Sequence, residues 1–193
     1  MNITDLLSNK EKKTLIIKSL KKDDILFYEL DLCECIGIIL EGSVNITSYL
    51  EDGKQIIYNI INKDGIFGNN LLFSSNPYFK GDIQANSDTK IALIYKNNLI
   101  KLLQSNEQFL IEYIKHQSNF AKQLNSRIKL LSIDNAEERF YYYLHENNNI
   151  INIESVSELS RNLNLQRETV SRLLSKLIKE NKIIKTKNII RRR

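Results

Sequence analysis

Cysteine and histidine are scarce in this chain of 193 residues, and tryptophan is absent. The two cysteines, Cys33 and Cys35, cannot by themselves supply the roughly four thiolates that an iron–sulfur cluster takes. Haem would need axial ligands, and the two histidines, His116 and His145, come after the strand-rich part of the sequence. Both histidines are expected to be surface or packing residues. We therefore predict no cofactor and no metal site.

The cysteine pair itself has two interpretations. On a strand, residues two apart lie roughly 6.6 Å from each other, which is long for an unstrained disulfide. A reactive thiol needs an electropositive neighbourhood, and Glu34 between the two cysteines opposes one. We favour ordinary small residues, and a redox-active pair stays open as the alternative.

Arginine is absent before Arg127. The first part of the chain therefore has no guanidinium that could hold a phosphate through two parallel hydrogen bonds. No stretch approaches the ~18 apolar residues of a membrane span, and the polar, lysine-rich start of the chain lacks a signal-peptide core. We expect a cytoplasmic protein without a membrane partner.

The net charge is concentrated at one end. Residues 1–134 carry 16 Lys+Arg and 16 Asp+Glu, whereas residues 135–193 carry 12 and 7, which accounts for the whole net charge of +5. From Arg167 onward there are 10 basic and 2 acidic residues. A basic module is typical of DNA binding, and a neutral module in front of it is expected to sense or to dimerise.

Residues 23–96 alternate short apolar runs with turn signals, and all six glycines lie between positions 37 and 81. Asp52-Gly53, between two β-rich runs, predicts a hairpin. Short strands with regular turns predict a sandwich or a barrel. The expected strands cover residues 25–28, 36–40, 44–46, 56–61 and 91–95.

No glycine or proline lies between Glu107 and Leu131, which predicts one long helix. Its seam residues recur with a/d spacing over about three heptads, as in helices that pair with a second copy. The seam consists of Leu110, Ile114, Gln117, Ala121, Leu124, Ile128 and Leu131. Gln117 is polar and can fix the register of such a pair at some cost in stability. We favour a homodimer, and the alternative is a long helix that lies on its own barrel.

Asp134 and Glu137 have the spacing of an N-cap and its N3 partner, so a new helix is expected to start at Asp134. The break at residues 133–134 is a candidate hinge. The aromatic run of residues 140–143 is expected to serve core and interdomain packing.

A helix-turn-helix is predicted from Ser155 onward. Ser155 and Glu158 form a capping box, and Asn164 tolerates the left-handed turn between two helices. The second helix buries Val170, Leu173, Leu174 and Leu177 and turns Arg167, Glu168, Ser171, Arg172 and Ser175 outward. Arginine can bind guanine through two parallel bonds, and glutamate can accept a bond from cytosine.

Residues 183–190 predict a two-stranded wing with a basic tip at Lys185 and Lys187. Lysines at such a tip suit DNA phosphates. The role of the terminal Arg191–Arg193 run is left open.

The chain resembles the cyclic-AMP receptor protein / fumarate-nitrate reduction regulator (CRP/FNR) superfamily over nearly its whole length. The resemblance rests on Ile39-Leu-Glu-Gly-Ser-Val44, Asp52-Gly-Lys54 and Phe67-Gly68, and above all on Gln166-Arg-Glu-Thr-Val-Ser-Arg-Leu-Leu174. It implies an α+β fold with an N-terminal double-stranded β-helix, which is a jelly roll like that of cyclic-nucleotide-binding domains. This sensor barrel would span residues 1–106, a dimerisation helix 107–133, and a winged helix-turn-helix 134–193.

The resemblance also assigns roles. The family's recognition-helix Arg, Glu and Arg fall on Arg167, Glu168 and Arg172, and Ser171 matches the family branch that uses Glu, Ser and Arg. Gln166 departs from the pattern, since the family usually has a better capping residue there. A regulator of this kind is not an enzyme. Its partners would be double-stranded DNA, a second copy, and RNA polymerase if it is an activator.

In nucleotide-binding members of the family, a Gly-Glu pair and an Arg-Ser or Arg-Thr pair hold the ribose and the cyclic phosphate. Here Gly68 is followed by Asn69 and Asn70, and Lys80 stands near the place of the arginine. On the long helix, Leu124 and Asn125 occupy the positions where relatives offer hydroxyl groups. We expect no cyclic nucleotide binding, and these six residues form a possible pocket for an unknown small-molecule effector.

Two alternatives to an effector-controlled regulator are kept. The first is an effector-independent regulator, or one that responds to redox through Cys33 and Cys35. The second, more distant, is a cupin-like barrel enzyme, which would need several histidines inside the barrel.

Overall fold

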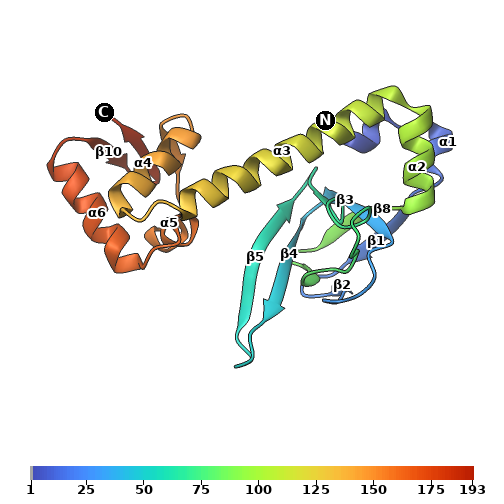
Figure 1. The fold of residues 1–193 in the computed structure, drawn as a ribbon, viewed down its shortest axis with the longest axis horizontal. Helices are drawn as coiled ribbons and strands as arrows, with labels where there is room; N and C mark the ends of the chain where they lie inside the picture. Colours follow the sequence, from blue (N-terminus) through green and yellow to red (C-terminus); the bar gives the residue numbers. More distant parts are fainter. Residues whose placement is uncertain (1) are drawn as a thin grey trace. The chain divides into compact units, whose positions relative to one another are not determined.

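The computed structural model describes residues 2–193, apart from the side chain of Tyr58. By its packing the chain divides into two compact units, one that ends at Asn119 and one that runs from Phe120 to Arg193. Each unit has a hydrophobic core of its own. Figure 1 shows long strands in the first unit, and helices with short strands in the second.

Two four-stranded antiparallel sheets build the first unit. The first sheet has the order β1-β8-β3-β6, from Ile16–Leu20, Thr89–Tyr95, Cys35–Glu41 and Ile66–Phe67. The second has the order β2-β7-β4-β5, from Ile25–Phe27, Asp82–Ala85, Ser43–Tyr49 and Gln55–Asn62. Apolar side chains from both sheets, among them Ile38, Val44 and Ile83, are fully buried in one core. The predicted jelly roll is confirmed, and β1, β6 and β7 go beyond the predicted strands.

The turn between β4 and β5 is the predicted hairpin. Gly53 has φ +79°, a left-handed conformation that suits glycine because it has no Cβ. The backbone N–H of Lys54 donates to Asp52 Oδ1 over 2.9 Å, which stabilises the same turn.

Three helices precede or follow the strands of the first unit: η1 (Ile3–Leu6), α1 (Asn9–Lys12) and α2 (Lys96–Ser105). The long helix α3 spans Glu107–Leu131, as predicted. Asn106 stabilises its start, since its Oδ1 accepts a hydrogen bond of 3.0 Å from the N–H of Phe109. Phe109 and Tyr113 are buried in the barrel core. The first turns of α3 therefore pack on the chain's own barrel, which was the alternative to pairing with a second copy.

The second unit contains the end of α3, three further helices and one small sheet. The helices are α4 (Ala136–Glu146), α5 (Val156–Leu163) and α6 (Arg167–Lys179). The sheet has the order β10-β11-β9, from Ile183–Thr186, Ile189–Arg192 and Ile150–Asn152. Its core gathers Leu130, Phe140, Leu144, Leu163, Val170, Leu177 and Ile190. This is the predicted winged helix-turn-helix, with β9 as a third strand that the sequence pattern does not predict.

The start of α4 corrects one prediction. The N-cap is Asn135 and not Asp134, because Asn135 Oδ1 accepts from the N–H groups of Glu137 and Glu138 over 2.9 and 3.1 Å. The helix therefore starts one residue later than predicted. Two N–H groups of its first turn, which have no partner within the helix, are hydrogen-bonded to the cap.

Candidate nucleic-acid interface

The turn between α5 and α6 is built as the sequence predicts, with one exception. Ser155 caps α5, accepting a 3.1 Å hydrogen bond from the N–H of Glu158. The capping box is only half formed, however, because the Glu158 carboxylate accepts from the N–H of Glu154 over 2.6 Å and not from that of Ser155. Asn164 takes the left-handed conformation, with φ 50° and ψ 50°. This turn reverses the chain and sets the direction of α6.

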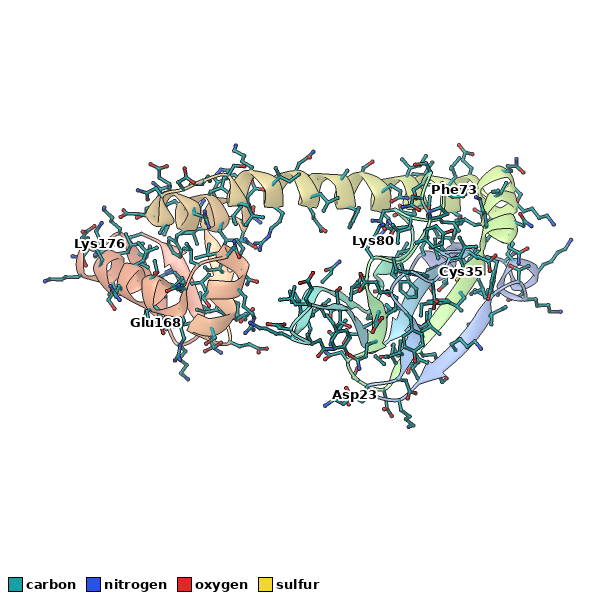
Figure 2. All side chains as sticks on the ribbon, turned by 60° about the horizontal axis from the view of Figure 1, so that its bottom comes forward. Asp23, Cys35, Phe73, Lys80, Glu168 and Lys176 are labelled. Carbon is teal, nitrogen blue, oxygen red and sulfur yellow. The ribbon has the colours of Figure 1, made fainter. Side chains whose placement is uncertain are left out.

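Helix α6 has a buried face and an exposed face. Val170, Leu173, Leu174 and Leu177 are buried, as predicted. The exposed face carries Arg167, Glu168, Ser171, Arg172 and Ser175. Figure 2 labels Glu168 and Lys176 on this helix. Gln166 precedes the helix without a side-chain capping bond, as its departure from the family pattern predicts.

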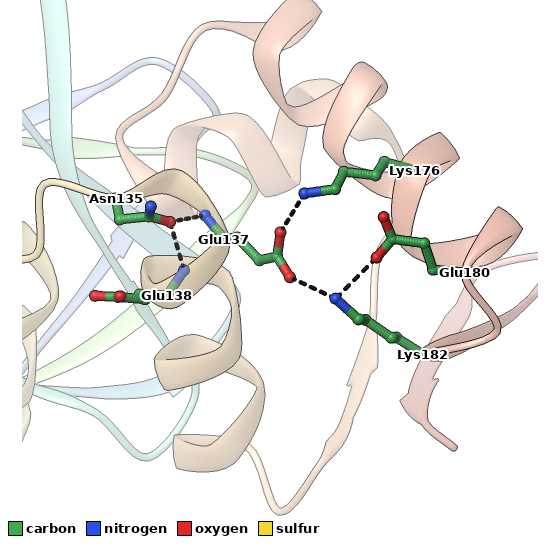
Figure 3. Close-up of polar contacts among 6 residues, drawn as sticks. All are labelled: Asn135, Glu137, Glu138, Lys176, Glu180 and Lys182. Atoms are coloured by element: carbon green, nitrogen blue, oxygen red, sulfur yellow. Dashed lines mark hydrogen bonds and ion pairs between the residues drawn. The ribbon is translucent and has the colours of Figure 1, made fainter.

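A small ion-pair network ties α6 and the root of the wing to α4 (Figure 3). Glu137 of α4 accepts from Lys176 over 2.8 Å and from Lys182 over 3.2 Å. Glu180 pairs with Lys182 over 2.8 Å. Hydrogen bonds from the two lysines hold the pKa of Glu137 below its ordinary value, and Glu137 raises the pKa of Lys176. These two lysines are therefore partly neutralised within the chain.

The predicted DNA-reading residues are not neutralised in this way. In residues 2–193, no carboxylate lies within ion-pair distance of Arg167 or Arg172. Ser175 donates to the backbone oxygen of Ser171 within the same helix. The two guanidinium groups and the Glu168 carboxylate are thus presented to solvent along one helix face.

The wing has an exposed basic tip. Lys185 lies on β10, and Lys187 lies in the turn to β11 with φ 48°; both are exposed. Ile183 and Ile190, on the inner side of the hairpin, are buried. The terminal arginines contact the domain itself. The Arg192 guanidinium lies 5.4 Å from the centre of the Tyr141 ring, and Arg193 donates to Asn181 Oδ1 over 2.8 Å.

The predicted seam of α3 is largely exposed in the single chain. Ile114 is 52% exposed, Leu124 48%, Ile128 63% and Leu131 41%. Leu110 and Gln117 are half-buried, and Ala121 is exposed.

Gln117 has partners within its own chain. Its Nε2 donates to the backbone oxygen of Asn69 over 2.9 Å and to the Tyr113 hydroxyl over 3.1 Å. Its Oε1 accepts from Asn69 Nδ2 over 2.6 Å. Gln117 therefore joins α3 to the barrel, a role that the seam spacing does not predict.

The six possible pocket residues are divided between the two units. Asn69 is buried and paired with Gln117, whereas Asn70 and Lys80 are exposed. Gly68, with φ +76°, packs closely against the backbone of Cys35. Leu124 and Asn125 belong to the second unit. Figure 2 labels Lys80 and Cys35 in the first unit.

Both cysteines are buried in the barrel. Burial raises the pKa of Cys33 to about 11 and that of Cys35 to about 12. The Cys33 thiol donates to the backbone oxygens of Cys35 over 3.4 Å and of Gly68 over 3.7 Å. At neutral pH both groups are thiols, which are poor nucleophiles and poor metal ligands.

Among the described residues, no group of three or more His, Cys, Asp or Glu side chains is placed to hold a metal ion. No helix within residues 2–193 is both long and apolar enough to cross a membrane.

Comparison with known proteins places the first unit in a family. Residues 17–106 match the family described as the cyclic nucleotide-binding domain. The "Anaerobic regulatory protein" of Bacillus subtilis (strain 168) is 26% identical over 174 residues, which cover 84% of this chain and 73% of that protein. Together these similarities support the interpretation of the chain as a CRP/FNR-type transcription regulator.

Solved structures share the fold of this chain over almost its full length. A CooA variant from Carboxydothermus hydrogenoformans has a TM-score of 0.73 at 18% identity, covering 100% of this chain and 91% of that one. The catabolite activator protein of Thermus thermophilus has a TM-score of 0.57 at 18% identity, covering 99% of this chain and 93% of that one. The fold implied by the resemblance is confirmed.

Two residues with structural roles in this interface escape the sequence pattern. Glu137 reads as a capping partner, and Arg139 reads as one more charge on a surface helix. Arg139 is instead buried, which helical spacing could have indicated, since it lies one turn before Tyr143, which packs against the core.

Proposed function

We propose that this CRP/FNR-type regulator binds double-stranded DNA as a homodimer, with α6 as the recognition helix. The observation that carries the proposal is the exposed face of α6, where Arg167, Glu168 and Arg172 project from a helix whose opposite face is buried. Arginines that are free of carboxylate partners can donate to the O6 and N7 of guanine, and Glu168 can accept from cytosine N4. Ser171 and Ser175 lie on the same face and support the contact.

The wing supplies contacts that do not depend on sequence. Lys185 and Lys187 are exposed at its tip, where they suit phosphates. The excess of basic over acidic residues after Arg167 favours the same polyanion. RNA polymerase would be a further partner if the protein activates transcription, and we expect it to act in the cytoplasm, where its operators lie.

Dimerisation is assigned to α3. A stripe of exposed apolar side chains at a/d spacing needs an apolar partner, and a second copy of the same stripe provides one. We retain residues 1–106 as the sensor barrel, 107–133 as the dimerisation helix and 134–193 as the DNA-binding domain. Packing divides the chain inside α3, at residues 119 and 120. The start of the helix packs on the barrel, and its end packs on the DNA-binding domain, which we also call the reader.

We further propose that the barrel does not bind cyclic nucleotides, although its family is named for them. The asparagine that follows Gly68 is already paired with Gln117, and the barrel has no arginine for the phosphate. Titration calorimetry with cyclic AMP and cyclic GMP should detect no binding. Saturable binding at tens of micromolar or tighter would contradict this part of the proposal.

The burial of both thiols favours ordinary packing roles over redox sensing. An effector-independent regulator is the second candidate, favoured by the reciprocal Asn69–Gln117 bonds, which join barrel and helix without a ligand.

Selection from a random DNA pool tests the main proposal. The two recognition helices of a symmetric dimer lie about 34 Å apart, so the selected sequence should be an imperfect palindrome. By resemblance to the family, its half-sites should contain a core such as TGTGA or TTGA. Enrichment of no sequence, or of a site without two-fold symmetry, would overturn the proposal.

A further inference from the structure

Arg139 of α4 is a charged side chain inside the core of the second unit. Only 8% of it is exposed. In the described part of the chain no carboxylate pairs with it. Charged side chains are almost never buried without a compensating partner, so its surroundings must hold the guanidinium by other means.

Backbone oxygens from two segments surround the guanidinium. Its Nε and Nη2 donate to the oxygen of Ile133 over 2.8 and 2.5 Å. Its Nη1 donates to the oxygens of Leu163 and Asn164 over 3.2 and 3.1 Å. Leu163 is the last residue of α5, and the carbonyl end of a helix is its negative pole, so the positive charge is compensated there.

These two segments are the places where the direction of the chain is decided. Ile133 lies in the link between α3 and α4, the candidate hinge of the sequence analysis. Leu163 and Asn164 form the left-handed turn from which α6 departs. One planar group thus bonds the link that follows the long helix and the turn that precedes the recognition helix.

The end of α3 is held to the same body by two other contacts. Leu130 is buried in the core of the second unit. Arg127 Nη1 donates to the backbone oxygen of Asn162, near the end of α5. The break at residues 133–134 is therefore spanned by side-chain contacts and is not a free joint.

We infer that Arg139 is a positioning residue that fixes the direction of α6 relative to the end of α3, and thereby the spacing of DNA half-sites that the dimer accepts. The inference rests on the proposed function, since it needs DNA binding by a dimer paired through α3. Base readout within a half-site comes from the exposed face of α6. The separation of the two recognition helices comes from how each reader is joined to its own α3. Arg139 is placed to control the separation of the two recognition helices without affecting base readout.

Arg139→Lys separates the two properties. Lysine keeps the charge, but its ammonium is a point donor that cannot reach both segments with a planar fork. We would measure binding to operators that carry identical half-sites at the preferred spacing and at spacings one and two base pairs longer or shorter. We expect discrimination between spacings to fall about fivefold to tenfold, the effect of about one lost hydrogen bond of ordinary strength, with unchanged base preferences and unchanged dimer mass.

Arg161→Lys is the matched control, because Arg161 lies exposed on α5 in the same domain, and it should keep the wild-type spacing preference. If the lysine variant does not fold, Arg139→Gln removes the buried charge and allows the same comparison. Wild-type spacing discrimination in a folded Arg139 variant overturns the inference, and so does loss of base preference together with spacing preference. Failure of wild type to select any sequence is a different result, which refutes the proposed function instead.

Discussion

A polar cluster in the first unit is hydrogen-bonded internally, whereas the arginines of α6 in the second unit are exposed to solvent. In the barrel, Asn69, Tyr113 and Gln117 bond to one another, and two buried thiols are held as thiols. On α6, Arg167 and Arg172 face solvent, and no acid of the described residues pairs with them. The DNA-binding domain thus has free donors for a polyanion, whereas Asn69 and Tyr113 of the first unit are bonded to Gln117 of the same unit.

The same contrast exists within the reader. Lys176 and Lys182 are bound to Glu137 on α4, whereas Lys185 and Lys187 at the wing tip are not. Basic residues in one domain therefore divide into those that hold the domain together and those that are available for DNA. A count of charges from the sequence cannot make that division.

The largest effect is expected from breaking the dimer. Ile114→Lys together with Leu124→Lys places charges in the exposed stripe of α3 and should give monomers in sedimentation. Because the dimer binds two half-sites at once, affinity for the operator should fall by about two orders of magnitude or more. Ile16→Lys with Ile17→Lys is the matched control, since these β1 residues are exposed to a similar degree. If the Ile114→Lys, Leu124→Lys double variant is still dimeric at micromolar concentration, α3 is not the dimer interface.

Arg172→Ala tests whether the presented side chains read bases. We expect a loss of about 1–3 kcal/mol of binding free energy and a relaxed preference at one base pair. Selection from a random pool with wild type, Arg172→Ala and the control Arg161→Ala measures both effects. If the sequence preference of Arg172→Ala matches that of wild type, Arg172 does not read a base.

Wing and network lysines can be compared directly. Lys185→Ala and Lys187→Ala should each weaken all sequences alike and flatten the slope of log affinity against log salt by about one unit, if each lysine contacts one phosphate. Lys182→Ala is the control, because Lys182 is bound to Glu137 and Glu180 and should leave the slope unchanged. Equal slopes for all three variants would remove the distinction between structural and DNA-facing lysines.

A smaller effect is expected from the buried thiols. Folding raises the pKa of Cys33 from about 9 to about 11, so the folded state holds its proton more tightly than the unfolded state. The stability that this contributes is complete below about pH 9 and is lost as the pH rises toward 11. As the pH rises from about 9 to about 11, the melting temperature of the double variant Cys33→Ala, Cys35→Ala should therefore fall less than that of wild type. Rapid alkylation of native wild type at about pH 8 would contradict thiol burial and favour the redox alternative.

The long helix and the reader could be predicted from sequence because their signals are local. The extent of α3 follows from the seven-residue repeat that runs from Leu110 to Leu131, and the turn between α5 and α6 follows from Asn164 between two amphipathic helices. The seven-residue repeat assigns Gln117 to the predicted seam but does not indicate that it bonds to the barrel. Its partner Asn69 lies 48 positions away, and no local pattern connects the two.

Other elements depend on contacts that only the folded chain provides. Strand β9 is three residues long and exists through its pairing with β11. Helix α2 begins at Lys96, and the preceding Tyr95 makes no side-chain capping bond, so the sequence carries no start signal there. Asp134 and Asn135 are both good capping residues. The bond from Arg139 to Ile133 helps to fix the chain just before them, and Asn135 is left in the capping position.

Helix α3 has one end in each of two cores, with Phe109 and Tyr113 buried in the barrel and Leu130 in the reader. Between these anchors its side chains are mostly exposed, and a few unsupported helical turns are marginally stable in water. In a monomer the middle of α3 can therefore unwind while both cores stay folded, so the two units would melt independently. Pairing through the stripe would bury that middle section, and the protein would then unfold as one cooperative unit whose melting temperature depends on concentration.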